Sequence, residues 1–261
     1  MIEVLVILQQ YYNDKAKPNP FVWDMVESMM AAPAAAVGYG EQGLAVLYAL
    51  RDYPVVNMTG VVIGSQLPWV EVQALHSGAR KVLTVDYQKI NVIGSKKIEY
   101  IHPIEFANDW RNSVGKYDFA ISFSSIEHSG LGRYGDPIDP VGDLREAQKI
   151  LCLLKRGGVA FIVIKFCFTS YQKGLQFSIV SKHVRNAIFG GIFYLGIPVG
   201  RDSIFYNAHR LYGRMRLAMI MTGFEWLATY RGSNPHSQRR TENDYKEYTD
   251  KYIDLYVMKR I

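Results

Sequence analysis

The chain has 261 residues, of which 49% are hydrophobic and 21% are charged, and its formal net charge is +6. This length and this balance predict one sizeable globular core and argue against a largely disordered chain. The charge is mild, and no dense run of Lys and Arg is interleaved with aromatic residues, so the sequence does not indicate nucleic-acid binding.

The cysteines and the apolar runs bear on the compartment. Cys152 and Cys167 form neither a disulfide framework nor a zinc-binding pattern, which favours a reducing compartment. Residues 1–8 are apolar but carry an acid and lack a basic start, so they are not typical of a signal peptide. No run reaches the roughly 18 apolar residues that a membrane span needs. We therefore expect a cytoplasmic protein without a membrane span, unless this chain is an isoform that has lost an N-terminal signal.

The first part of the chain, residues 1–54, is predicted to be a helical extension to one α/β domain over 55–261. Asn19-Pro20 is typical of a helix start and predicts a short helix over 21–30.

The stretch 38–43, GYGEQG, matches the G-x-G-x-x-G pattern of dinucleotide-binding turns. That pattern needs a strand before it and an acid about 20 residues after it. Here AAPAAA precedes it, and Asp52 comes too early. We therefore interpret the motif as a turn that opens a helix over 44–51, with Tyr39 lying over a cofactor as the alternative.

An apolar run over 57–63 predicts the first strand of the sheet, and residues 81–85 predict the second, with a helix between them. The turn after the first strand begins with Gly64 and Ser65, and its N–H groups can receive an anion or a carboxylate. Asp86 follows the second strand, where a carboxylate can accept hydrogen bonds from both hydroxyls of a ribose. We predict that these three residues bind a cofactor; the alternative is that Asp86 only ends its strand or caps a helix.

Residues 98–101 predict a third strand, and the apolar run 118–123 predicts a fourth. A helix follows, because the apolar positions over 144–154 recur with the helical period. We expect Asp143 to cap this helix and Gly157-Gly158 to end it. With the strand that comes after the glycines, these elements predict a βαβ crossover.

Ser124, Glu127 and His128 follow the fourth strand, at the edge of the sheet where open α/β folds bind ligands. Histidine titrates near neutral pH, so His128 is a candidate general base that Glu127 would orient. Ser124 is predicted to lie against the cofactor. The alternative is that Glu127 and His128 merely cap the next loop.

Three aspartates crowd the loop that begins with Arg133 and Tyr134. The spacing of Asp136, Asp139 and Asp143 does not fit an EF-hand, and two prolines set turns between them, so we predict no metal site. We interpret the loop as a rigid turn with a helix cap, and we keep Arg133, Tyr134 and Asp136 as candidates for binding a substrate.

A second polar loop, nearer the C-terminus, carries Asn207, His209 and Arg210. The strand before this loop is expected to neighbour the fourth strand, so the loop should face Glu127 and His128. Two histidines, an acid and an arginine beside a crevice suit acid–base catalysis or the binding of an anionic substrate. A hydrogen-bonded loop network is the alternative of equal weight.

Two parts of the sequence resemble known families. From Tyr117 to Gly158, the pattern YDFAISFSSIEH, followed by a helix and LKRGG, resembles class I S-adenosylmethionine-dependent methyltransferases of type 11. The stretches SSIEHSGLGRYGDPIDPVGDL and IPVGRDSIFYNAHRLYG resemble a nematode-rich family of uncharacterised proteins, the domain-of-unknown-function-268 family. This second resemblance extends from about Val37 onward, and it implies a methyltransferase-like fold with no established activity.

The resemblance implies a doubly wound, mostly parallel, seven-stranded Rossmann-like sheet. An antiparallel edge hairpin of residues 224–230 and 252–259 would close it. The first and fourth strands then flank the switch in strand order, so the turn at Gly64 and the side chain of Glu127 would share one crevice. The methyltransferase pattern has an acid and Gly-x-Gly-x-Gly after the first strand, whereas this chain has a single glycine there.

In the uncharacterised family the Gly-Gly turn leads directly into a strand like IFYLGIPVG, but here residues 159–191 intervene. These 33 residues contain no Asp or Glu and end in a second Gly-Gly. We expect them to be an insertion within the α/β domain, from alternative splicing or a faulty gene model. The rival hypothesis is a genuine excursion that includes a fifth strand over 159–164.

The resemblance therefore implies methyl transfer from S-adenosylmethionine to an acceptor that the sequence does not identify, a small molecule or a protein. His128, Glu127 and His209 would be the catalytic residues. The alternative is a non-catalytic ligand- or protein-binding module on a degraded methyltransferase scaffold. A third hypothesis is an enzyme of another class that uses the two histidines on a different ligand. The pattern does not indicate an oligomeric state.

Overall fold

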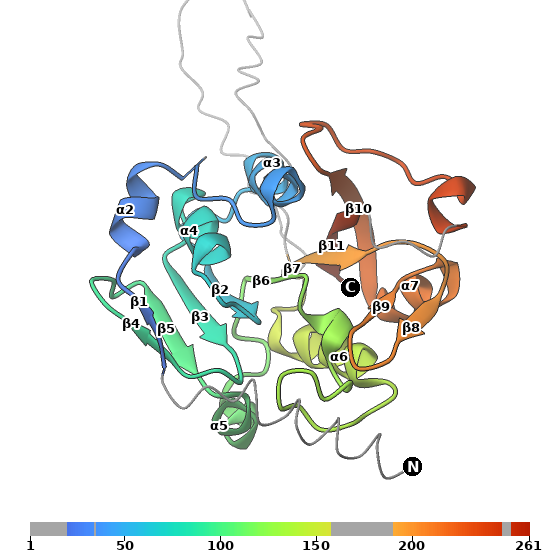
Figure 1. Cartoon of the computed structure of the whole chain (residues 1–261). Helices are drawn as coiled ribbons and strands as arrows, with labels where there is room; N and C mark the ends of the chain where they lie inside the picture. Colours follow the sequence, from blue (N-terminus) through green and yellow to red (C-terminus); the bar gives the residue numbers. More distant parts are fainter. Residues whose placement is uncertain (1–19, 34, 158–189, 247–251) are drawn as a thin grey trace, which may run out of the picture.

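The computed structural model describes residues 20–33, 35–157, 190–246 and 252–261. Within them, one mixed sheet contains seven strands (Figure 1). They are β2 Thr59–Ile63, β3 Lys81–Val85, β5 Ile98–Ile101, β6 Phe119–Phe123, β7 Ile192–Pro198, β10 Phe224–Arg231 and β11 Ile253–Arg260. Their spatial order is β5-β3-β2-β6-β7-β11-β10. The predicted fold class is confirmed, because β11 pairs antiparallel with β7 and β10 while the other pairs are parallel.

Helices cover both faces of this sheet, as expected when crossovers join parallel strands. The helices α3 Leu44–Asp52 and α4 Trp69–His76 lie on one side, and α6 Gly142–Leu153 and α7 Arg214–Ile220 lie on the other (Figure 1). Among the described residues, no helix is long and apolar enough to cross a membrane. The remaining elements are α2 Val26–Ala31, α5 Pro103–Asn108, the short strands β1 Phe21–Trp23, β4 Ile90–Val92, β8 Ser203–Phe205 and β9 His209–Leu211, and the 3₁₀ turns η1 Gly40–Gly43, η2 Trp110–Asn112, η3 Ile126–His128 and η4 Glu242–Tyr245.

The helix predicted over 21–30 is wrong in its first half. β1 pairs parallel with β4, and α2 begins only at Val26. Trp23 is buried in the same core as α3 and α4, so pairing and packing with distant residues override the local helix signal. The helix predicted over 44–51 is confirmed as α3, which packs against β10, β11 and α4. The described part of the predicted extension therefore lies against the main sheet.

The helix α6 follows β6, and β7 pairs parallel with β6, but Asp143 does not cap α6. The N-cap residue is Val141, which offers no capping side chain. Asp143 is fully buried instead, where its carboxylate accepts a hydrogen bond from the Tyr212 hydroxyl at 2.8 Å and pairs with Arg216 at 2.6 Å. Asp143, which the sequence pattern assigned to the start of α6 as a cap, is thus an internal partner of Tyr212 and Arg216.

Gly157 and Gly190, the described residues on either side of 158–189, lie close together. The strand predicted over 159–164 lies outside the described residues, and β7 pairs directly with β6. A Cβ atom on Gly190 would lie only 3.1 Å from the Cα atom of Gly157. The Gly191 N–H donates a hydrogen bond to the carbonyl oxygen of Lys155 at 2.8 Å. The start of β7 is therefore attached to the residues that follow α6.

Candidate functional site

The turn after β2 is in direct contact with the turn after β6. Gly64 has a φ of +76°, a conformation that glycine adopts without strain. A Cβ atom at this position would lie 1.9 Å from Oγ of Ser125. The first and fourth predicted strands thus bring their carboxyl ends together, as expected. The Ser125 side chain thus occupies the space that a Cβ atom on residue 64 would need.

Asp86 ties the end of β3 to this turn. Its Oδ2 atom accepts a hydrogen bond from the Ser65 N–H at 2.8 Å, and its Oδ1 atom accepts one from the Gln88 N–H at 2.6 Å. Burial raises the pKa of the Asp86 carboxyl above its usual value, while the two N–H groups and nearby His102 act in the opposite direction. A carboxylate offers about four acceptor sites, so each oxygen keeps capacity for a ligand hydroxyl.

A buried acid, Glu71 in the first turn of α4, lies beneath the same turn, and the sequence analysis missed it. Its side chain is fully buried; Thr84 Oγ1 donates to its Oε1 atom at 2.8 Å, and Ser65 Oγ lies 3.1 Å from its Oε2 atom. Burial raises the pKa of this carboxyl to about 7. An acid in the first turn of a helix is ordinarily explained by the helix dipole, so the sequence carried no signal of burial.

The G-x-G-x-x-G stretch opens a helix, as predicted, and η1 leads directly into α3. A Cβ atom on Gly38 would lie 2.6 Å from Nε1 of Trp69, so this glycine allows the loop to approach the ring closely. The Phe123 ring lies 5.2 Å from that of Trp69 and 5.4 Å from that of Tyr39. Tyr39 is 54% exposed. The loop thus adds an accessible aromatic ring beside the carboxyl ends of β2 and β6.

Glu127 is buried directly after β6. Ser124, which has a φ of +50°, donates from its hydroxyl to Glu127 Oε1 at 2.8 Å. The Oε2 atom is buried and has no hydrogen-bond partner among the described residues. Burial raises the pKa of the Glu127 carboxyl to about 7. The acid is therefore poised to exchange a proton near neutral pH.

His128 connects this acid to the hairpin of β8 and β9. Its Nδ1 atom lies 2.5 Å from the carbonyl oxygen of Ala208. Because a carbonyl only accepts hydrogen bonds, Nδ1 carries the hydrogen, and Nε2 is the basic nitrogen of the neutral ring. Nε2 lies 3.6 Å from Glu127 Oε1. The Glu127 carboxylate can therefore stabilise a proton on His128.

The hairpin brings the predicted second histidine to the first. The His209 ring lies 6.2 Å from the His128 ring and 5.1 Å from the Phe205 ring, and the Tyr134 ring lies 5.3 Å from the His128 ring. Asn207, at the tip of the hairpin, has a φ of +54° and a buried side-chain oxygen. Four rings therefore follow one another from Tyr134 to Phe205.

Two predicted substrate-binding side chains are used within the protein. Arg210 is fully buried and donates to the carbonyl oxygens of Ser129 at 2.6 Å and Glu127 at 3.2 Å. Asp136 is buried and accepts a hydrogen bond from the Gly130 N–H at 2.6 Å. Arg133 instead lies over the Tyr134 ring, at 5.7 Å from its centre. Across the described residues, no group of three or more His, Cys, Asp or Glu side chains could hold a metal ion.

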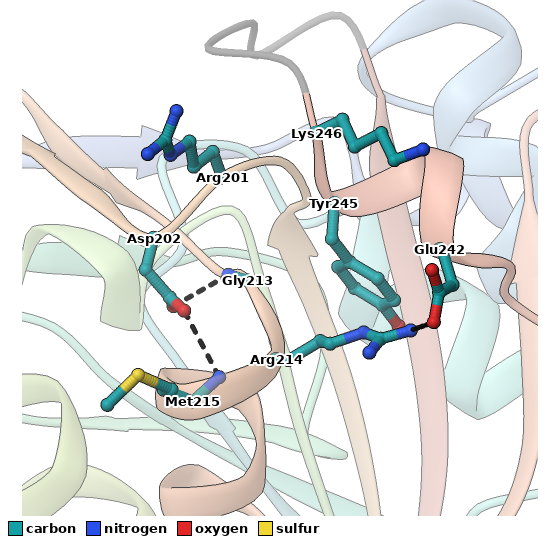
Figure 2. Close-up of a pocket in the computed structure, with 8 residues that line it drawn as sticks. All are labelled: Arg201, Asp202, Gly213, Arg214, Met215, Glu242, Tyr245 and Lys246. Atoms are coloured by element: carbon teal, nitrogen blue, oxygen red, sulfur yellow. Dashed lines mark hydrogen bonds and ion pairs between the residues drawn. The ribbon is translucent and has the colours of Figure 1, made fainter.

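A pocket of about 420 Å³ lies elsewhere, between the loop after β7, the start of α7 and η4. Figure 2 shows that the Asp202 carboxylate points to the N–H groups of Gly213 and Met215, at 2.8 and 3.1 Å, and that Arg214 pairs with Glu242 at 2.7 Å. Asp202, Arg214 and Glu242 are thus engaged with other residues of the pocket, and none of the predicted site residues lines it. We therefore centre the candidate site on the strand ends at Gly64, Asp86 and His128.

Comparisons with known proteins agree with this architecture. The family described as "Caenorhabditis protein of unknown function, DUF268" matches residues 57–178 and 179–260. The break between the two matched pieces falls inside the segment 159–191. A comparison with curated proteins found no match.

A comparison with solved structures found methyltransferases. The 1,6-didemethyltoxoflavin-N1-methyltransferase of Burkholderia thailandensis, crystallised with 1,6-didemethyltoxoflavin and S-adenosylhomocysteine, is 12% identical with a TM-score of 0.50, over 91% of this chain and 86% of that one. The N-methyltransferase NodS of Bradyrhizobium japonicum, in complex with S-adenosylhomocysteine, is 11% identical with a TM-score of 0.45, over 91% and 97% of the two chains. At such identities the first likeness shows the fold alone.

Proposed function

The chain belongs to the Caenorhabditis DUF268 family, whose function is unknown, and from that premise we propose that it is a methyltransferase that uses S-adenosylmethionine. One observation carries the proposal. The Asp86 carboxylate is bonded to the N–H of Ser65 at 2.8 Å, at the turn beside the switch in strand order between β2 and β6. Open α/β sheets bind nucleotide-like ligands at that switch.

The residues at the turn suit the nucleoside end of this cofactor. The Asp86 oxygens keep acceptor sites for ribose hydroxyls beside their bonds to Ser65 and Gln88. Gly64 and Ser124 begin the turns after β2 and β6, both with a positive φ, and the exposed Tyr39 ring is available to cover a ligand. When bound, S-adenosylmethionine supplies a methyl group that a nucleophilic acceptor atom attacks.

The acceptor side is supplied by the residues after β6 and by the hairpin. The Nε2 atom of His128 takes the proton that an acceptor O–H or N–H group loses on methylation, and the Glu127 carboxylate balances the resulting imidazolium charge. The rings of His209 and Tyr134 both pack edge-on against the His128 ring. Most of the rate enhancement then comes from holding the reactants in place. The acceptor is a small molecule or a protein side chain.

A binding module without catalysis is the second candidate, and the Ser125 side chain favours it. This side chain fills the clearance beside Gly64, and the sequence has no further glycine in the turn to open it. A chain of this kind would keep the scaffold and bind a different ligand or a protein at the strand ends.

Calorimetric titration with S-adenosylhomocysteine separates the two candidates. We expect the full chain to bind, Asp86→Ala to weaken binding at least about tenfold, as expected when a charged hydrogen-bonding group is lost, and the exposed-acid control Asp109→Ala to bind like the wild type. Ser125→Gly should bind at least as tightly as the wild type, because it opens the space beside Gly64. A folded chain that binds no S-adenosylhomocysteine, with or without Ser125, would favour the binding module.

A further inference from the structure

The contacts around Glu71, below the turn after β2, bear on whether its carboxyl group carries a proton. Ser65 Oγ is 2.9 Å from the carbonyl oxygen of Leu67 and 3.1 Å from Glu71 Oε2. A hydroxyl has one hydrogen to donate, and a carbonyl oxygen only accepts. Both contacts are hydrogen bonds at the same time only if Ser65 donates to Leu67 and a protonated Glu71 donates to Ser65. Thr84 Oγ1 donates to the other Glu71 oxygen at 2.8 Å.

We propose that Glu71 is a positioning residue, held as a neutral carboxylic acid, whose proton keeps the turn at Ser65 in the form that binds the cofactor. The inference rests on the proposed function, because it concerns the same cofactor site. Ser65 connects Glu71 to the cofactor site. Its hydroxyl accepts a hydrogen bond from the protonated Glu71 carboxyl, and its N–H donates to the Asp86 carboxylate at 2.8 Å. The cofactor thus meets a turn whose geometry depends on one buried proton.

Ionising Glu71 would break this arrangement. Its carboxylate would then compete with the Leu67 carbonyl for the single Ser65 hydrogen, and the charge would be fully buried. An unpaired buried charge is strongly unfavourable, so the turn would have to change or take in water. Loss of the Glu71 proton therefore weakens the turn that carries the Ser65 N–H.

The surrounding charges favour the neutral acid. Burial is the main cause of the raised Glu71 pKa, and the charged group that acts on it most strongly is the Asp86 carboxylate, which raises it further. His102 offsets part of the Asp86 charge. The helix α4 also packs against α2, α3 and β3, whose nearest charged residues lie at the surface. Those residues are Glu27 of α2, Arg51 and Asp52 of α3, and Lys81 of β3.

The test is to titrate the full chain and its Glu71→Gln variant with S-adenosylhomocysteine at several pH values between 6 and 8.5. The matched control is Glu225→Gln, which changes an exposed glutamate in the same way. The wild type and the control should lose affinity about tenfold for each pH unit above about 7, as one released proton requires. Glutamine reproduces the neutral acid, since its carbonyl accepts from Thr84 and its amide donates to Ser65. Glu71→Gln should therefore lack the tenfold loss per pH unit, and any dependence that remains would belong to other groups of the crevice such as Glu127.

Wild-type binding that is independent of pH, or a Glu71→Gln variant that shows the wild-type pH dependence, would overturn the inference. If the folded wild type binds no S-adenosylhomocysteine at any pH, the proposed function fails, and urea unfolding then tests the proton by itself. The midpoint of the wild type should fall relative to that of Glu71→Gln as the pH rises from 6 to 8.5. A constant difference between the two midpoints would show that Glu71 is not held neutral.

Discussion

Removing residues 159–191 and joining Gly158 to Ile192 should give a chain that folds and is more stable than the full-length chain. The ends already meet, since Gly157 and Gly190 are in contact and the Gly191 N–H is bonded to the Lys155 carbonyl. Each doubling of an open loop costs about 0.6 kcal/mol of closure entropy. On the insertion hypothesis the 33 residues are such a loop, so shortening it to about four residues gains about 2 kcal/mol. For a domain of this size, that corresponds to about 4–8 °C in the unfolding midpoint.

The assay is urea and thermal unfolding of both chains, followed by circular dichroism. On the insertion hypothesis the urea midpoint rises while the m value stays nearly the same, because the deleted residues do not belong to the buried core. A third chain, with the 33 residues replaced by a Gly-Ser linker of equal length, should behave like the full chain. A shortened chain that fails to fold, or that unfolds at lower urea, would refute the reasoning and make the segment part of the native core.

Three further predictions concern the strand ends. Arg210→Ala leaves several buried carbonyl oxygens without their donor, so it should lower the free energy of unfolding by about 3–5 kcal/mol in urea, and a loss below about 1 kcal/mol would contradict this. Gly64→Ala should lower the free energy of unfolding by about 1–3 kcal/mol because of its positive φ alone, and the clash of the new methyl group with Ser125 should lower it further. When Ser125→Gly is added to Gly64→Ala, only the cost of the clash should be recovered, which a double-mutant cycle measures. The pKa of Glu127 is higher in the folded state than in the unfolded state, so its stabilising contribution is complete below about pH 4.5 and is lost as the pH rises through about 7. Glu127→Gln should therefore match the wild type at pH 4 and exceed it by about 3 kcal/mol at pH 8. Equal stability at both values would show that the carboxyl is not desolvated.

Much of the sheet could be predicted because its signals are local. The strand β3 was expected over the same residues that it occupies, since a short apolar run stands between a glycine and an acid. The helix α3 followed from the G-x-G-x-x-G turn and the apolar period after it. The meeting of His128 and His209 followed from the adjacency of β6 and β7, which brings the loops after them to one edge of the sheet.

The remaining features depend on contacts between residues far apart in the sequence. Glu71 and Asp143 both resemble ordinary acids at a helix start, and only the packing of distant elements buries them. Arg210 carries a charge that suggests an exposed substrate contact, yet it satisfies carbonyl oxygens of a loop about 70–80 residues earlier. β1 forms because it pairs with β4, a strand that lies far from it in the sequence, so its own residues do not indicate a strand.

The turn at the centre of the site also carries its own optical reporters. Trp23 donates from its indole nitrogen to the carbonyl oxygen of Gln66, at 3.3 Å, and Trp69 follows that turn with its ring against Gly38 and Phe123. Indole emission changes when its hydrogen bonding and its solvent exposure change. Two of the four tryptophans of the chain are therefore attached to the turn that a ligand would touch. The natural fluorescence of this protein can follow occupancy of the crevice without any label, and a screen for unknown ligands can begin from that signal.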